Sequence, residues 1–176
     1  EGGGFKGSQA RLGPARLHHC MRMLGQAELM VELMMARSRE RSTFGRKLAE
    51  YDTVQTWIAE ARVGIELART MLWRTAWLID RNGHAGSWRE VSIAKVAVPR
   101  TVQRIADRAV QLFGAMGGSD DLLAHHALAY ARILRIGDGP DEVHLRQLYR
   151  TEPSPPWGIA DSPYVIPEPA GEPAAA

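Results

Sequence analysis

The fold is organised around the stretch Arg132-Ile-Leu-Arg-Ile-Gly-Asp-Gly-Pro-Asp-Glu-Val-His144. An apolar run stops here at Asp138, which stands between two glycines and is followed by Pro140. Glycine permits positive φ or the close approach of a ligand, and proline suits the first position of a helix. The stretch therefore predicts a tight turn between two helices that presents an acidic side chain. The same pattern is also typical of an ordinary helix joint whose acid caps the next helix.

Helical periodicity extends along the chain on both sides of this turn. Apolar residues at three- and four-residue steps predict five helices, over about 14–40, 54–82, 88–113, 122–134 and 141–150. Pro99 predicts a kink near Ala97, and the three tryptophans of the second helix are expected to be packing residues. No segment alternates as a strand does. The expected fold is all-α, an up-down four-helix bundle with a short fifth helix.

The two ends of the chain differ in composition from this helical domain, which we place at 14–150. Residues 1–13 are rich in glycine and predict a flexible lead-in, and residues 151–176 are rich in proline and alanine and predict a disordered tail.

Composition excludes several classes of protein. With 45% hydrophobic residues, 176 residues can form one domain with a substantial core. A net charge of +2, from scattered basic residues, gives no electrostatic footprint for nucleic acid. The single cysteine, Cys20, rules out an internal disulfide framework. We find neither a membrane-spanning segment nor a secretory signal, so we expect a protein that is not secreted.

Other chemistries have weak support in the sequence. His18-His19 and His125-His126 are adjacent pairs that point about 100° apart on a helix, so we expect no metal site there. The Gly-rich segment 113–119 follows a helix and not a strand, so the context of a dinucleotide fingerprint is missing.

Three segments together resemble the C-terminal helical domain of the acyl-CoA dehydrogenase family. Arg41-Ser-Thr-Phe-Gly45 is similar to that family's Arg-x-x-Phe-Gly loop, and the run from Gln111 to Gly118 is similar to its Gln-x-x-Gly-Gly-x-Gly element. Gly137-Asp-Gly139 stands in the place of its Tyr-Glu-Gly turn. The continuation Asp-Gly-Pro-Asp-Glu-Val-His resembles a branch of the family with long-chain or substituted acyl substrates.

The resemblance implies FAD-dependent α,β-dehydrogenation of an acyl-CoA thioester. Asp138 would be the base that removes the α-proton, in place of the more usual glutamate, which is one methylene longer. Arg16 and Gly139 would lie along the acyl-CoA. The residues implied to contact FAD are Arg41, Thr43, Phe44, Gln111, Leu112, Phe113, Gly114, Ala115, Pro140 and Glu142; the last two replace a Thr and a Gln common in the family.

The family also implies partners and missing parts. Its members are homodimers or homotetramers that pass electrons to an electron-transfer flavoprotein or a similar acceptor, and they carry an N-terminal helical domain and a middle β-domain before this one. We therefore interpret residues 1–13 as the lead-in from that β-domain. We expect this chain alone to bind FAD weakly or not at all and to turn over no substrate. The alternative is a non-catalytic helical oligomerisation module. The expected location is the cytoplasm of a bacterium, or a mitochondrion or peroxisome.

Overall fold

The computed structural model describes residues 3–155 and residue 158. Five helices account for most of this part: α1 (Gly4–Glu40), α2 (Asp52–Gly86), α3 (Trp88–Phe113), α4 (Ala124–Leu134) and α5 (Asp141–Thr151). Two 3-10 turns, η1 (Leu48–Glu50) and η2 (Gly114–Gly118), and a hairpin of β1 (Ser42–Thr43) and β2 (Arg46–Lys47) connect them. The predicted all-α bundle with a short fifth helix is confirmed, with this small hairpin as the addition.

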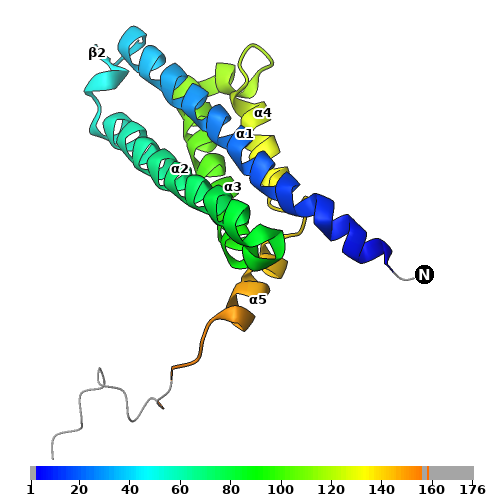
Figure 1. Ribbon diagram of the computed structural model, residues 1–176. Coiled ribbons are helices and arrows are strands. Elements are labelled where there is room, and N and C mark those ends of the chain that lie inside the picture. Colours follow the sequence, from blue (N-terminus) through cyan, green and yellow to red (C-terminus); the bar gives the residue numbers. More distant parts are fainter. Residues whose placement is uncertain (1–2, 156–157, 159–176) are drawn as a thin grey trace, which may run out of the picture.

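Helices α1 to α4 run alternately up and down, and α5 lies beneath the lower end of the bundle (Figure 1). Helix α3 is central, because it packs against α1, α2, α4 and α5. Its inward face carries small and β-branched residues, which permit close helix packing, and α1 contributes a row of flexible methionines. Fully buried side chains of this core include Met23, Met30, Met34, Ile65, Val98, Val102, Ile105, Ala109 and Ala131.

Two prolines lie inside helices instead of at helix ends. Helix α1 begins at Gly4 and not near Pro14, so the segment expected to be a flexible lead-in is helical from Gly4 on. Helix α3 likewise continues through Pro99. A proline removes one backbone hydrogen bond, but a helix continues where the neighbouring turns are held by packing. Val98 and Pro99 are buried in the core, which provides that packing.

Helix α2 changes course at the place where the sequence predicted its end. Gly83 has φ 68° and ψ 174°, and one further turn follows to Gly86. Two of its tryptophans were wrongly expected to be packing residues, since Trp73 is 69% exposed and Trp77 55% exposed. Trp57 does pack against the core. Apolar periodicity shows that a residue lies near the apolar face of its helix. It does not show whether another helix of the same chain packs against that residue.

The tip of the hairpin is an exposed aromatic residue. Ser42 pairs with Lys47 and Thr43 with Arg46, so Phe44 and Gly45 form a two-residue turn. Both have positive φ, 48° and 81°, as a type I′ turn requires. The Tyr51 hydroxyl donates a 2.8 Å hydrogen bond to the Thr43 carbonyl and ties the hairpin to the start of α2.

Within the described residues, none of the helices combines the length and apolar character that crossing a membrane requires. The predicted disordered tail lies largely outside the described residues.

Candidate active site

Asp138 lies at the corner between α4 and α5 with a left-handed backbone, φ 57°. Aspartate tolerates this conformation better than most residues, and such strain is concentrated at functional sites. Gly139 follows at φ 110°, and Pro140 is the N-cap residue of α5. The Asp138 side chain is only 21% exposed and points back toward α1. The turn expected from the sequence is present, but its acid is half-buried instead of presented to solvent.

Two buried cations hold the backbone of this corner. The Arg16 side chain donates from Nε to the Asp138 carbonyl oxygen at 2.7 Å, and its guanidinium lies 4.7 Å from the centre of the Trp88 ring. Lys95 donates from Nζ to the carbonyls of Leu134 and Gly139. Charge-assisted hydrogen bonds are stronger than neutral ones, so the turn is fixed at both ends. Burial lowers the pKa of both Arg16 and Lys95.

Asp141 anchors the start of α5. Its Oδ2 accepts hydrogen bonds from Arg100 Nε at 3.0 Å and from Arg135 Nε at 2.9 Å, and the residue is 2% exposed. Arg100 belongs to α3, and Arg135 follows the last residue of α4. One carboxylate therefore joins three helices beside Asp138.

His144 completes the packing under the turn. It is 1% exposed, and its Nδ1 lies 3.1 Å from the Ser92 hydroxyl. Burial, reinforced by the nearby charges of Lys95 and Arg16, lowers the pKa of His144 to about 4. A Cβ added to Gly139 would lie 3.0 Å from His144 Nε2, so glycine is required there both for space and for its positive φ.

The carboxylate of Asp138 faces one histidine. His19 Nε2 lies 3.4 Å from Asp138 Oδ2, and His19 Nδ1 lies 3.2 Å from the Tyr130 hydroxyl. Oδ2 is buried and has no hydrogen-bond partner within the described residues. The 3.4 Å separation suits an ion pair with a protonated imidazole but exceeds the usual length of an N–H···O hydrogen bond. Within the described residues, Asp138 Oδ2 thus faces His19 without accepting a full hydrogen bond.

The other predicted FAD contacts gather at the opposite end of the bundle. Arg41 and Thr43 line one open cavity of about 510 Å³ together with Arg37, Leu48 and the segment 111–116. Gly114 has φ 65°, and nothing lies within 4 Å of the position of its missing Cβ, which leaves room for a ligand against the backbone. Phe44 is fully exposed at the hairpin tip.

One copy of the chain cannot bring these two regions together. Arg16 and Arg41 lie about 25 residues apart along α1, which corresponds to roughly 37 Å of helix. Pro140, Gly139 and exposed Glu142 lie at the Asp138 corner, while the Arg41 and Gln111 segments lie at the far end.

One histidine pair departs from the geometric expectation. His125 Nε2 and His126 Nε2 lie 3.3 and 3.5 Å from the same oxygen, Asp120 Oδ1, so the divergence of adjacent side chains, from which we expected no metal site, does not keep these two rings apart. Side-chain rotation brings together rings whose Cβ directions differ. Asp120 is 93% exposed, and the group lies at the start of α4, where the helix dipole disfavours a cation.

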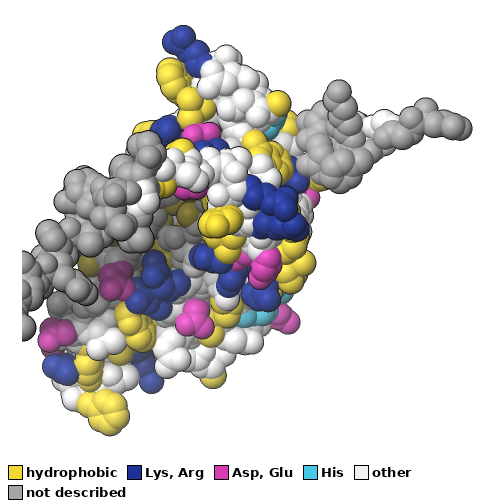
Figure 2. Space-filling model, turned by 90° about the horizontal axis from the view of Figure 1, so that it is seen from below, with side chains coloured by type: hydrophobic (Ala, Val, Ile, Leu, Met, Phe, Trp, Pro, Cys, Tyr) yellow, Lys and Arg dark blue, Asp and Glu magenta, His cyan; other side chains and the backbone are white. Residues whose placement is uncertain are grey.

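Viewed from the α5 end, basic, acidic and hydrophobic side chains are interspersed (Figure 2). No large surface of a single charge forms on this face in the part of the chain that the structure describes.

Comparison with known proteins identifies the class of this domain. Residues 2–152 match the family model described as acyl-CoA dehydrogenase, C-terminal domain. The chain therefore belongs to the acyl-CoA dehydrogenase family, a family of oxidoreductases. Acyl-CoA dehydrogenase family member 11 of chicken (Gallus gallus) is 47% identical over 152 residues, which cover 86% of this chain and 20% of the relative.

Solved structures agree with this assignment. An acyl-CoA dehydrogenase homologue from Mycobacterium abscessus superimposes with a TM-score of 0.82 at 41% identity, over 85% of this chain and 37% of that one. Butyryl-CoA dehydrogenase from Megasphaera elsdenii gives 0.76 at 27% identity, over 85% and 39%. The chain thus spans less than half the length of each of these relatives.

The sequence did not predict a role at the Asp138 corner for four residues: His19, Lys95, Tyr130 and Asp141. Lys95 could have been noticed as a lone cation on the apolar face of its helix. Asp141 stands at the start of the predicted fifth helix, but its partners Arg100 and Arg135 depend on packing between helices. The partner of His19 likewise depends on a contact with a residue 111 positions away.

Proposed function

We propose that this domain supplies the catalytic base for FAD-dependent α,β-dehydrogenation of an acyl-CoA thioester. The Asp138 carboxylate would remove the proton from the α-carbon, and FAD, when bound, would supply the acceptor for the hydride of the β-carbon. The observation that carries this proposal is the half-buried carboxylate, held on a left-handed corner with its Oδ2 facing His19. A base that is poorly hydrated and fixed in direction is suited to proton abstraction.

The residues at the far end of the bundle fit a flavin dinucleotide. Arg37 and Arg41 bring two guanidinium groups to the cavity, and guanidinium groups pair well with a pyrophosphate. The segment 111–115 offers small residues and an accessible backbone, and Thr43 offers a hydroxyl. We assign FAD contacts to Arg41, Thr43 and the residues from Gln111 to Ala115, with Phe44 reaching outward from the hairpin.

The distance between the two regions supports an oligomer. A flavin that touches Asp138 of one copy can touch the Arg41 cavity only of another copy, because about 37 Å of α1 separates them within one chain. Phe44, fully exposed on a strained turn, is placed to reach into a neighbouring copy. We propose a homodimer or homotetramer in which each flavin site is shared.

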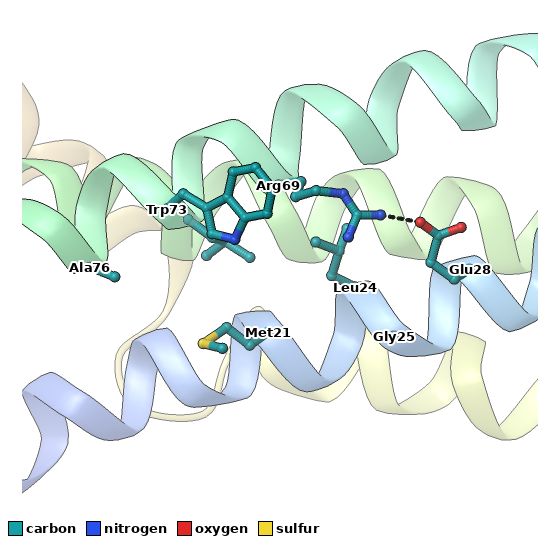
Figure 3. Close-up of a pocket in the computed structure, with 8 residues that line it drawn as sticks. Met21, Leu24, Gly25, Glu28, Arg69, Trp73 and Ala76 are labelled. Carbon is teal, nitrogen blue, oxygen red and sulfur yellow. Dashed lines mark hydrogen bonds and ion pairs between the residues drawn. The ribbon is translucent and has the colours of Figure 1, made fainter.

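A groove between α1 and α2 is the candidate surface for this association. It measures about 260 Å³ and is lined mainly by apolar side chains, with Met21 of α1 facing Trp73 of α2 (Figure 3). The ion pair of Glu28 and Arg69 closes one end. Leu67, Trp77 and Val63 continue the exposed apolar surface along α2. This surface also favours the second candidate function, a non-catalytic oligomerisation module that keeps the helical interfaces alone.

At the Asp138 corner, Gly139 would let the thioester approach the backbone closely. Arg16 would act there mainly through the turn that it holds, and Pro140 and Glu142 lie where flavin or substrate would pass. An electron-transfer flavoprotein or a similar acceptor would reoxidise the flavin. Because the family's β-domain supplies part of the flavin site, we expect the chain by itself to bind FAD weakly.

Flavin absorbance tests the proposal. We would record spectra of the purified protein with added FAD, alone and after mixing with the family's N-terminal and β-domains, before and after addition of acyl-CoA. Bound flavin should bleach with acyl-CoA, and Asp138→Asn should abolish bleaching without lowering flavin content. Asp120→Asn, a change at an exposed acid, is the matched control. Bleaching that survives Asp138→Asn would refute the assignment of the base, and a colourless oligomer under every condition would favour the module.

A further inference from the structure

We infer that His19 is a positioning residue for Asp138, and that Tyr130 selects the imidazole tautomer that does this. The inference rests on the proposed function of Asp138 and adds two residues from two other elements, α1 and α4, to the same site. The three side chains form a line in which His19 lies between the Tyr130 hydroxyl and the Asp138 carboxylate.

The tautomer of His19 follows from the hydrogen-bond donors and acceptors that face its two ring nitrogens. Neutral imidazole carries one N–H, and the two ring nitrogens of His19 face different partners. Tyr130 can donate its O–H to Nδ1 at 3.2 Å, which leaves the imidazole proton on Nε2. Nε2–H then points to Asp138 Oδ2, which can only accept while it is ionised. The reverse tautomer would place two lone pairs, of Nε2 and of Oδ2, against each other.

The separation of 3.4 Å is longer than a full N–H···O hydrogen bond. Catalytic hydrogen bonds are commonly long before substrate binds and shorten in the complex. Oδ2 is buried and accepts no hydrogen bond from the residues that the structure describes, so a small rotation toward His19 satisfies it. With Oδ2 held in this way, the other oxygen, Oδ1, takes the α-proton, and the imidazole stays neutral throughout the step.

The shorter side chain of aspartate explains why such support matters. One methylene less than glutamate restricts the positions that the carboxylate can reach, so its direction must be set by neighbours. The other charged groups around the corner are Arg16 from α1 and Lys95 from α3, and both are directed to backbone carbonyls of the corner. Arg22 lies over the Tyr130 ring, 5.7 Å from its centre. His19 differs from both, because its Nε2 faces the carboxylate itself, 3.4 Å from Oδ2.

Nitrogen NMR of the chain labelled at histidine tests the tautomer without any turnover. At a pH where His19 is neutral, its ¹⁵N shifts should report the Nε2–H tautomer, and Tyr130→Phe should shift the population toward Nδ1–H. His18, the exposed neighbour, should keep its shifts in that variant and serves as the internal control. A wild-type His19 in the Nδ1–H form would overturn the inference, whether or not Asp138 is the base.

Kinetics of the protein loaded with FAD, after mixing with the family's N-terminal and β-domains, test the positioning role. We expect His19→Ala to lower kcat by about 10- to 100-fold, less than the roughly 10²- to 10⁴-fold contribution of a general base, with KM little changed. The acidic limb of the pH profile of kcat should also move. His19→Gln keeps an N–H donor and should restore most of the rate. His18→Ala is the matched control, expected to behave as wild type.

The outcomes separate this inference from the proposed function. If Asp138→Asn abolishes bleaching while His19→Ala keeps the wild-type kcat and pH profile, then Asp138 is the base and the role of His19 is refuted. If Asp138→Asn remains active, the proposed function itself fails. Thermal unfolding and flavin content identify a variant that has merely lost its fold. In that case the tautomer in wild type and in Tyr130→Phe still decides the question.

Discussion

Arg16 and Asp138 are 122 residues apart in the sequence, and the Arg16 Nε donates a 2.7 Å hydrogen bond to the Asp138 carbonyl. This bond ties the first helix to the turn that carries the candidate base. It fixes the backbone of Asp138 and leaves the carboxylate for chemistry. Arg16 is 4% exposed, so the bond is made in a setting that water does not reach easily.

Replacing Arg16 with methionine should destabilise the domain by about 2 kcal/mol, the usual worth of a hydrogen bond to a charged group. The variant loses the donor to Asp138 and the contact with the Trp88 ring but keeps an unbranched apolar stem. Urea unfolding followed by circular dichroism measures the change. Arg11→Met, at an exposed position of the same helix, should stay within about 0.5 kcal/mol of wild type. Equal stabilities of the two variants would contradict the role given to Arg16.

The two glycines beside Asp138 should respond differently to alanine. Gly139→Ala forces a Cβ onto a residue with φ 110° and brings it 3.0 Å from His144 Nε2. We expect a loss of about 1 to 3 kcal/mol, typical of strained backbone. Gly137→Ala is the matched control, because the nearest atom to its Cβ would lie 3.6 Å away. Thermal unfolding of both variants measures the difference, and the prediction fails if Gly137→Ala is the more damaging.

Stability should fall on mild acidification because of His144. Its pKa is lowered from the ordinary 6.5 to about 4 in the folded protein, so the unfolded chain takes up the proton first as pH falls. This contribution is fully present above pH 6.5 and is lost between about 6.5 and 4. The linkage amounts to about 2 kcal/mol between pH 7 and pH 5.

Denaturant unfolding at the two pH values tests this linkage. His144→Gln should be less stable at pH 7 but should lose less stability on acidification. The control His126→Gln, at a histidine that is 59% exposed, should retain the wild-type pH dependence. An unchanged pH dependence in His144→Gln would show that the linkage originates elsewhere.

The exposed surface of α2 should carry part of the self-association. Trp73→Glu places a charge in the apolar groove opposite Met21, so sedimentation should detect smaller species than in wild type. Leu123→Glu, an equally nonpolar-to-acidic change at a residue 58% exposed beside α4, is the control. Both variants should keep the wild-type helical content. An oligomer that resists Trp73→Glu would place the interface on another face.

The sequence was sufficient for the helices and the turn because both depend on local chemistry. Apolar spacing over α2, α3 and α4, the helix break at Gly83 and the corner at Gly137-Asp-Gly139 all follow from residues that are near neighbours. The same holds for the family assignment, which depends on three short segments in order. The local rules failed at Pro14 and at Trp73. Helix α1 continues through Pro14, and Trp73 is exposed because no other helix of the chain packs over it within the described residues.

Only the tertiary structure decided how Asp138 is held and which way it points. Its carbonyl partner Arg16, its carboxylate neighbour His19 and the Asp141 anchor to α3 connect residues from distant parts of the chain. Such contacts arise from the way α1, α3 and α4 pack, and no periodicity in one segment encodes them. The sequence by itself determined that an acid stands at a glycine corner between two helices. The packed bundle turned that acid inward to face a histidine, because three helices meet at that corner.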